Sequence, residues 1–355
     1  MTTTLVVLHG DQTGEELLNE TLRLADPSLL GCTLELLEFD CSLANRRKTK
    51  NGIVRDAADA IRTHCLGLKA ATITPEKSDD VGSPNALLRD RIGAQVIIRT
   101  GRPIPGLSAL GSVATPITVV RMAVDDAYNA QEWREEHEGN VIAYRTEHIS
   151  RETCRAVAQT SFHYASACDG IVFGGPKYTV SPIYEGLLKE ALDAAHEEWP
   201  LVRYEPQLID ATYALLLKHH GAPLVIPALN RDGDCLSDLV LALFGSLAGA
   251  ESLILRYGPS REHPEIVVAE APHGTAPTLE GKNIANPMAM ILALASVLHY
   301  AEDPRAVSAA TRIRTSVDTV LHQGIRTSDL GGTATTSNFV DAVLDTLRTT
   351  APTLS

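Results

Sequence analysis

The sequence lacks the features that mark several specialised classes of protein. Its six cysteines are scattered without a C-x-x-C pair, so neither a zinc site nor a disulfide framework is expected, and we predict reduced, buried thiols. No apolar run reaches the roughly 18 residues of a membrane-spanning helix. The first residues lack the charged and apolar regions of a secretion signal. We therefore expect a cytoplasmic protein without a membrane partner.

Positive charge and aromatic residues are also scarce. The chain carries 31 Lys and Arg against 44 Asp and Glu, a net charge of −13. An acidic surface repels phosphate backbones, so no nucleic-acid partner is expected. A site for an anion must therefore be built from local arginine or lysine, or around a cation. Aromatic residues make up only 5% of the chain, which predicts a mostly aliphatic core.

Short apolar runs alternate with stretches of helical spacing, which predicts an α/β fold. The length of 355 residues suggests two domains or one large α/β unit. The predicted strands are 4–9, 34–39, 70–74, 95–99, 117–121, 171–173 and 264–269. The predicted helices are 15–25, 56–64, 150–167, 184–197, 238–247 and 287–300. Exposed loops are expected at 45–50 and 131–140, and a further loop at 230–234 after the apolar segment 224–227. The G-x-G-x-x-G fingerprint of a conventional Rossmann site is absent from the sequence.

Two aspartates four residues apart form a candidate metal site. If a helix begins near Asp234, the carboxylates of Asp234 and Asp238 point to the same side. Two aligned carboxylates suit a hard cation such as Mg²⁺ or Mn²⁺. The alternative is capping of the helix N-terminus, where aspartate is also favoured. The spacing alone leaves both interpretations open.

Three arginines form a candidate anion pocket. Arg99 and Arg121 each end an apolar, strand-like run, and Arg89 closes the segment 83–89. Ligands of open α/β sheets bind beyond the carboxyl ends of the strands. Arginine pairs with carboxylate through two parallel hydrogen bonds, so these residues suit a polycarboxylate. The alternative is that they are ordinary surface arginines.

A long segment rich in small residues, EAPHGTAPTLEGKNIANP at 270–287, is a candidate binding loop. Small residues allow a ligand to approach the backbone closely, and His273 could stack on an adenosine. The alternative is a plain connecting loop, and its length and composition make the two about equally plausible.

With these segments in view, nearly the whole chain resembles the β-decarboxylating dehydrogenases, which act on isocitrate, homoisocitrate, 3-isopropylmalate and tartrate or D-malate. The segment NRDGDCLSD at 230–238 matches the family pattern N-x-x-G-D-x-x-S-D. Residues 270–287 follow E-x-x-H-G-[ST]-A-P…G-x-x-x-A-N-P, and DLGG at 329–332 matches a late D-L-G-G. HGDQTG at 9–14 and LKAATITP at 68–75 stand at two further family segments. The resemblance is to the isocitrate branch in particular, because Ser83, Asn85 and Arg89 fit its S-x-N-x-x-x-R.

The resemblance implies a role for each matching residue. It implies Lys177 and Tyr128 as catalytic residues. It implies a metal site for Mg²⁺ or Mn²⁺ at Asp210, Asp234 and Asp238. Substrate would be bound by Ser83, Asn85, Arg89, Arg99 and Arg121. The cofactor would be bound by Thr74, Glu270, His273, Gly274, Thr275, Ala276, Thr278 and Asn286.

The same resemblance implies the reaction and the assembly. The expected activity is metal-dependent oxidative decarboxylation of a 2-hydroxy di- or tricarboxylate that bears a β-carboxylate. Thr278 and Leu279 stand where NAD enzymes of the family have an acidic residue and NADP enzymes have Lys-Tyr. The missing cation favours NAD, with NADP possible. A homodimer with shared active sites is expected, in which Lys177 and Asp210 reach the neighbouring subunit's site.

The fold implied is that of isocitrate and isopropylmalate dehydrogenases, two α/β domains around a central cleft. Residues 1–103 and 253–355 would form a large cofactor-binding domain, and residues 104–252 a smaller dimerisation and catalytic domain. The family's R-E-N-T-E is RMAVD at 121–125 here, and Thr179 replaces an asparagine. These departures keep two alternatives open: an enzyme for an isocitrate analogue (homoisocitrate, isopropylmalate or a phosphonate), and a noncatalytic regulatory subunit.

Overall fold

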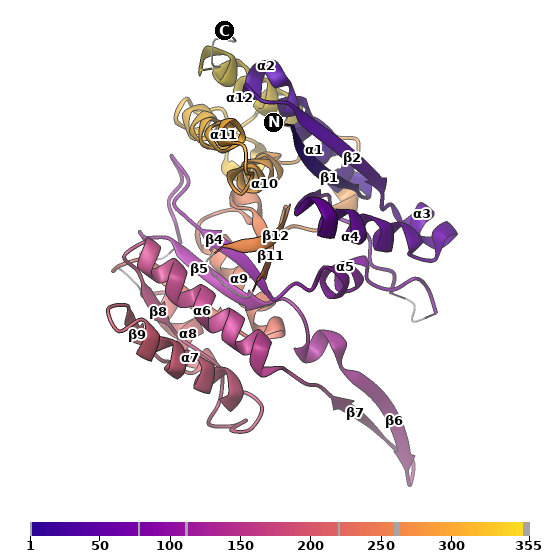
Figure 1. Ribbon diagram of the computed structural model, residues 1–355, viewed down its shortest axis with the longest axis vertical. Coiled ribbons are helices and arrows are strands. Elements are labelled where there is room, and N and C mark those ends of the chain that lie inside the picture. Colours follow the sequence, from indigo (N-terminus) through magenta and orange to yellow (C-terminus); the bar gives the residue numbers. More distant parts are fainter. Residues whose placement is uncertain (1, 77–78, 111–112, 219–220, 259–262, 351–355) are drawn as a thin grey trace.

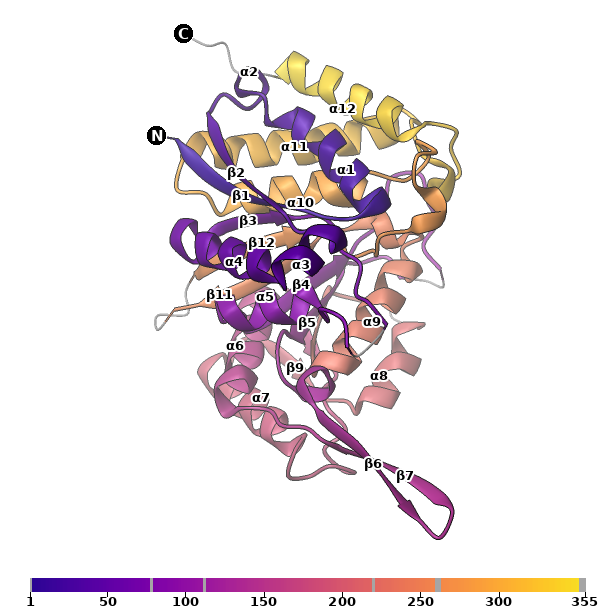
Figure 2. The same ribbon diagram turned by 90° about the vertical axis from the view of Figure 1, so that its right-hand side faces the viewer.

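In the part of the chain that the structure describes, ten strands form one continuous sheet. The computed structural model describes residues 2–76, 79–110, 113–218, 221–258 and 263–350. Across the sheet the strands follow the order β2 (Leu34–Asp40), β1 (Thr3–His9), β3 (Leu66–Lys69), β12 (Pro264–Glu270), β11 (Ser252–Tyr257), β4 (Val96–Gly101), β5 (Ile117–Met122), β10 (Leu224–Ala228), β8 (Ile171–Phe173) and β9 (Arg203–Glu205). A separate antiparallel hairpin, β6 (Gln131–His137) and β7 (Asn140–Thr146), projects from the molecule (Figures 1 and 2).

The middle of the sheet is antiparallel and its two flanks are parallel. β1 pairs in parallel with β2 and β3, and β10 does so with β5 and β8. Between them β11 runs antiparallel to β12 and β4, and β4 runs antiparallel to β5. The predicted α/β fold is therefore confirmed, with a large sheet of mixed direction.

Helices cover both faces of this sheet (Figure 1). They are α1 (Gln12–Leu22), α2 (Pro27–Leu30), α3 (Leu43–Thr49), α4 (Gly52–His64), α5 (Pro84–Ile92), α6 (Arg151–Ala167), α7 (Gly186–Glu198), α8 (Ile209–Leu216), α9 (Asn230–Leu243), α10 (Met288–His299), α11 (Pro304–His322) and α12 (Thr336–Thr350). On one face, α10, α11, α12, α6 and α7 share a single aliphatic core. On the other face, α4 and α5 pack over one core and α8 and α9 over another. The candidate active site lies between these last two cores.

The chain divides into two halves that share the sheet. It passes from β4 to β5 after residue 103 and returns at β11, so the proposed division, 1–103 with 253–355 against 104–252, follows the path of the chain. β4 and β5 pair over six positions, from Val96 with Met122 to Gly101 with Ile117. The boundary between the two halves thus falls between two hydrogen-bonded strands, β4 and β5. That the halves are separate domains stays a prediction.

The strand predicted at 70–74 is wrong, because β3 ends at Lys69. The following residues pack against the turn after β1 instead of extending the sheet. The amide of Asp11 donates to the carbonyl of Ala71 at 2.9 Å, and the Asp11 carboxylate accepts from the amide of Ile73 at 2.8 Å. A Cβ on Gly10 would lie 2.1 Å from the Ala71 carbonyl oxygen, so glycine permits this approach.

Three predicted loops are wrong. Residues 45–50 fall largely in α3, whose N-terminus is capped by Ser42, and Arg46 is fully buried rather than solvated. Residues 131–137 form β6, which is exposed as expected but paired with β7 through stacked Trp133 and Tyr144 rings 5.2 Å apart. Residues 230–234 are the first turns of α9, which ends at residue 243 instead of 247. Helix capping and cross-strand pairs stabilise these segments, and neither can be predicted from the spacing of apolar residues.

Two negative predictions can be compared directly with the structure. All six cysteines are free thiols, but only Cys32, Cys41 and Cys154 are buried, so the prediction of buried thiols holds for half of them. Among the described residues, no helix is long and apolar enough to cross a membrane.

Candidate active site

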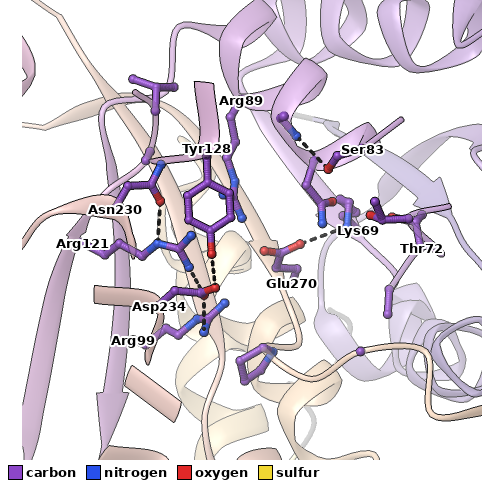
Figure 3. Close-up of a pocket in the computed structure, with 18 of the residues that line it drawn as sticks. Lys69, Thr72, Ser83, Arg89, Arg99, Arg121, Tyr128, Asn230, Asp234 and Glu270 are labelled. Atoms are coloured by element: carbon purple, nitrogen blue, oxygen red, sulfur yellow. Dashed lines mark hydrogen bonds and ion pairs between the residues drawn. The ribbon is translucent and has the colours of Figure 1, made fainter. Parts of the chain in front are cut away.

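A cavity of about 420 Å³ opens where the two halves meet. The ends of β4 and β5 and the helices α5 and α9 surround it, together with the turn after β12 (Figure 3). Its lining includes Lys69, Thr72, Thr74, Ser83, Asn85, Arg89, Arg99, Arg121, Tyr128, Asn230, Asp234, Glu270, His273 and Gly274. All five predicted substrate residues are therefore together in one cavity. Tyr128 and Asp234 join them there.

The three predicted arginines are buried, so their interpretation as ordinary surface residues is wrong. Arg89, Arg99 and Arg121 are 8%, 7% and 2% exposed. They come from α5, β4 and β5. Burial, reinforced by the neighbouring Arg89, lowers the pKa of Arg121 to about 10. The group remains cationic at neutral pH, and such a concentration of buried positive charge calls for an anion.

Polar side chains on α9 hold two of these arginines in place. Arg99 Nη1 donates to the hydroxyl of Ser237 at 3.0 Å and to the carboxylate of Asp238 at 3.1 Å. Arg121 Nε donates to Asn230 Oδ1 at 2.9 Å. Gly233 on the same helix makes the approach possible, because a Cβ there would lie 2.8 Å from the Arg121 side chain. The orientation of the arginines is thus fixed before any ligand binds.

Asp234 and Asp238 face the same side of α9, as their spacing predicted. Both approach Arg99 Nη1, at 3.6 and 3.1 Å respectively. Asp234 also pairs with Arg121 and accepts from the hydroxyl of Tyr128. Burial alone would raise the pKa of Asp234, but Arg121 and Tyr128 hold it below its usual range, whereas burial raises the pKa of Asp238. A carboxylate of low pKa is suited to a hard cation.

Lys177 and Asp210 lie apart from this cavity in the single chain. They form an ion pair with each other, and their side chains are 29% and 63% exposed. Neither lines the cavity. Among the described residues, no three acidic, histidine or cysteine side chains are grouped as a metal site. One chain therefore brings two of the three predicted metal carboxylates together, and Asp210 is not with them.

Several buried polar atoms around the cavity have no hydrogen-bond partner among the described residues. They are Thr72 Oγ1, Asn85 Oδ1, Arg89 Nε and His273 Nε2. Buried polar groups in folded proteins are nearly always paired, and an unpaired one calls for an explanation. Four such atoms border one cavity, and a polar ligand bound there is one kind of partner that would pair with them.

An adjoining cavity of about 340 Å³ has mostly apolar walls. His273 borders both cavities, while Ala276 and Asn286 line only the second. Of the remaining predicted cofactor residues, Thr74, Glu270 and Gly274 line the first cavity. Thr275 and Thr278 line neither cavity. Asn286 Nδ2 donates to Asp329 at 3.0 Å, and Asp329 of the late DLGG segment forms part of the wall of this adjoining cavity. An elongated ligand could extend from one cavity to the other past His273.

Sequence reasoning assigned no role to Lys69. Its ammonium donates to Glu270 at 3.0 Å and to the Ala70 carbonyl at 3.0 Å, although the side chain is 3% exposed. Arg89 and Lys69 lower the pKa of Glu270 against the effect of its burial. A lysine at the end of an otherwise apolar run was the available signal, because a buried charge needs a partner.

The fold and this cavity define a class of dehydrogenase, and comparison with known sequences places the chain in it. The chain belongs to the isocitrate/isopropylmalate dehydrogenase family, whose model matches residues 4–343. Members of this family are oxidatively decarboxylating dehydrogenases that use nicotinamide cofactors and a divalent metal.

Relatives in the family carry several names. The chain is 28% identical to an isocitrate/homoisocitrate dehydrogenase of Thermus thermophilus, covering 97% of this chain and 98% of that protein. It is 26% identical to an NAD isocitrate dehydrogenase catalytic subunit of Arabidopsis thaliana, covering 97% and 88%. Isocitrate dehydrogenase from Methylococcus capsulatus superposes with a TM-score of 0.85 at 22% identity, covering 97% and 99%. This last likeness concerns the fold.

Proposed function

We propose that this protein catalyses metal-dependent oxidative decarboxylation of isocitrate or an isocitrate-like 2-hydroxy acid. The observation that carries the proposal is the convergence of Arg89, Arg99 and Arg121 on one cavity beside Asp234. The arginines suit the carboxylates of a polyanion. Asn85 Oδ1 and Arg89 Nε, both unpaired, suit a further polar group of the substrate.

Two groups from solution would complete the chemistry. A Mg²⁺ or Mn²⁺ ion at Asp234 and Asp238 would polarise the hydroxyl oxygen of the substrate and stabilise developing negative charge. Nicotinamide would accept the hydride, with the adenosine in the adjoining apolar cavity. The hard oxygen donors of the two aspartates fit such a cation. NAD is preferred in this proposal because Thr278 and Leu279 offer no cation to a 2′-phosphate.

The chain's own residues would bind the substrate and move protons. Arg99 and Arg121 would hold carboxylates in fixed orientation. Tyr128 would protonate the carbon that loses CO₂. Burial and the hydrogen bond to Asp234 raise its pKa, so the hydroxyl still carries its proton at neutral pH. Lys177 would accept the proton of the substrate hydroxyl. Since its ammonium lies with Asp210 outside the cavity, we place both residues in the active site of the neighbouring subunit.

A homodimer with shared active sites follows from that placement. Apolar side chains near Lys177 and Asp210 are unusually exposed in the single chain: Val180 (74%), Ile183 (89%) and Leu217 (52%). Most residues of the β6–β7 hairpin are also exposed. A second copy would cover such surfaces. We further propose a cytoplasmic location, in keeping with six free thiols.

An enzyme for an isocitrate analogue is the second candidate. Ala123 and Val124 line the cavity where the resemblance would place an asparagine and a threonine, and Met122 behind them is buried. This wall has less hydrogen-bonding capacity than the family pattern implies. A substrate whose third substituent differs from that of isocitrate would suit it.

NAD(P)H absorbance with a panel of 2-hydroxy acids tests the proposal. We expect Mn²⁺-dependent reduction with isocitrate or a close trianionic analogue. Because Asn85 Oδ1 would be left unpaired by an isopropyl group, 3-isopropylmalate should be poorer by on the order of 10²–10⁴ in kcat/KM. Preference for 3-isopropylmalate would contradict the substrate assignment. No reduction with any member would contradict the enzymatic proposal.

A further inference from the structure

A second cavity, of about 440 Å³, lies on the opposite face of the sheet from the candidate active site. Neighbouring residues of β4 and β11 point to alternate faces. Arg99 Nε donates to Ser252 at 3.3 Å on the active-site face. The adjacent cross-strand pair, Ile98 and Leu253, lines the second cavity. The two cavities are therefore separated by the sheet, and no residue lines both.

The walls of this cavity come from both halves of the molecule. Tyr164 is in α6 of the smaller half, and Tyr300 follows α10 of the larger half. Their hydroxyl oxygens are 3.3 Å apart. Arg314 on α11 completes the wall on the large side. A ligand here would contact both halves.

The cavity contains one buried carboxylate and two arginines. Glu251 is 5% exposed. Its carboxylate accepts from Arg314 Nη2 at 2.7 Å and from the Ser296 hydroxyl at 2.8 Å. Arg102 Nη2 is farther away, 3.4 and 3.5 Å from the two carboxylate oxygens. Glu251 thus accepts two short hydrogen bonds, from Arg314 and Ser296, besides its longer contacts with Arg102.

Arg102 retains donor capacity that the described residues do not use. Its Nε is shielded from solvent and has no hydrogen-bond partner among them. The side chain as a whole is 36% exposed, so the guanidinium can be reached from the cavity. Thr100, Thr311 and Thr315 also line the cavity. Their hydroxyls are already engaged: Thr311 and Thr315 donate to backbone carbonyls of α11, and Thr100 bonds with Thr118. Asp318 on α11 also lines the cavity, so Glu251 and Asp318 are the two carboxylates among its walls.

We propose that this second cavity binds a small molecule that carries a carboxylate or phosphate group, held by the guanidinium of Arg102. Both anions match the planar fork of arginine. The active-site arginines are on the other face, so this site is separate from substrate binding. It takes its ligand between the two halves of the chain.

Calorimetric titration of the full-length protein with inorganic phosphate and, separately, with malonate tests the proposal. The variant Arg89→Gln removes one of the three active-site arginines and so reduces the binding of such anions there; comparison with Arg102→Gln in the same background then assigns binding to the second cavity. In that background we expect at least one probe to bind. Adding Arg102→Gln should weaken this binding at least tenfold. The probe that binds shows whether phosphate or carboxylate is preferred.

A second variant protects the test against misfolding. Thr315→Glu adds negative charge at an exposed position of α11, where it would repel an anion while leaving Glu251 and its partners intact. It should weaken binding at least tenfold with an unchanged Tm. Absence of binding to both probes in Arg89→Gln would overturn the proposal. So would unchanged binding in folded Arg102→Gln and Thr315→Glu proteins.

Discussion

The hydroxyl of Tyr128 donates a hydrogen bond to the carboxylate of Asp234, and both residues line the cavity (Figure 3). The tyrosine is in the short turn after β5, and the aspartate is on α9. Arg121 pairs with the same carboxylate and lies 5.1 Å from the centre of the Tyr128 ring. The proposed acid, one metal carboxylate and one substrate arginine therefore form a single connected group.

Replacing Tyr128 by phenylalanine should remove the proposed acid. We expect turnover to fall by on the order of 10²–10⁴, the usual contribution of a positioned proton donor. The Tm should change little, since the side chain is 46% exposed. Steady-state assays with a matched Tyr144→Phe control on the hairpin would measure this. Equal losses in both variants would contradict the role.

Removal of divalent cations should abolish activity. EDTA is expected to stop turnover, and Mg²⁺ or Mn²⁺ to restore it, because Asp234 and Asp238 would otherwise face the substrate carboxylates directly. Asp238→Asn should raise the Mn²⁺ concentration needed for half-maximal rate. Asp193→Asn, at a half-exposed position of α7, is the control. Full turnover in metal-free buffer would show that the aspartates serve another purpose.

Glu251 should contribute stability that depends on pH. Burial alone would raise its pKa, but Arg102 and Arg314 lower it from 4.5 to about 2. A carboxyl whose folded pKa is depressed stabilises above its unfolded pKa, and this contribution is lost as pH falls from about 4.5 towards 2. Glu251→Gln should therefore cost about 1–3 kcal/mol of unfolding free energy at pH 7. The difference from the unmodified protein should shrink below pH 4.5.

Denaturant titrations at several pH values would measure that difference. Glu190→Gln removes an exposed glutamate whose contact with Arg151 is 3.4 Å, and should have almost no effect. A constant difference between Glu251→Gln and the unmodified protein down to pH 3 would contradict the role of the two arginines.

Mixed subunits should show whether active sites are shared. Lys177→Met and Asp234→Asn chains should each be inactive alone. In a heterodimer of the two, one site would combine an intact Lys177 with an intact Asp234, so mixing should restore part of the activity. Subunit exchange followed by assay measures the recovery. Heterodimers that form but stay inactive would leave each subunit with its own complete set of residues.

The residues that line the cavity were predicted more accurately from the sequence than the helices, strands and loops that carry them. Asp234 and Asp238 could be placed on one helix face because a spacing of four is independent of where the helix begins. The start of α9 at Asn230 was not predicted, because the polar, glycine-containing segment NRDGD is typical of a loop. The hydrogen bond between Asn230 and Arg121 is visible only in the folded chain. The helices α11 and α12 and the strand β11 were not predicted either. They are placed by tertiary contacts: α11 packs against α10, α12 against α11, and β11 against β4.

The buried ion pairs could not be predicted from the sequence. Lys69 and Glu270 are 201 positions apart, and Glu251 meets Arg102 and Arg314 from distant segments. Such pairs depend on which strands are neighbours in the sheet. Without the strand order, a buried lysine or glutamate cannot be distinguished from an exposed one.

The central claim is oxidation coupled to loss of CO₂. It is tested most directly by measuring NAD(P)H formed and CO₂ released in one sample, with isocitrate or the best acid of the panel and saturating Mn²⁺. We predict one CO₂ for each NAD(P)H. Reduction of the cofactor without release of CO₂, or no reduction with any 2-hydroxy acid that bears a β-carboxylate, would contradict the account.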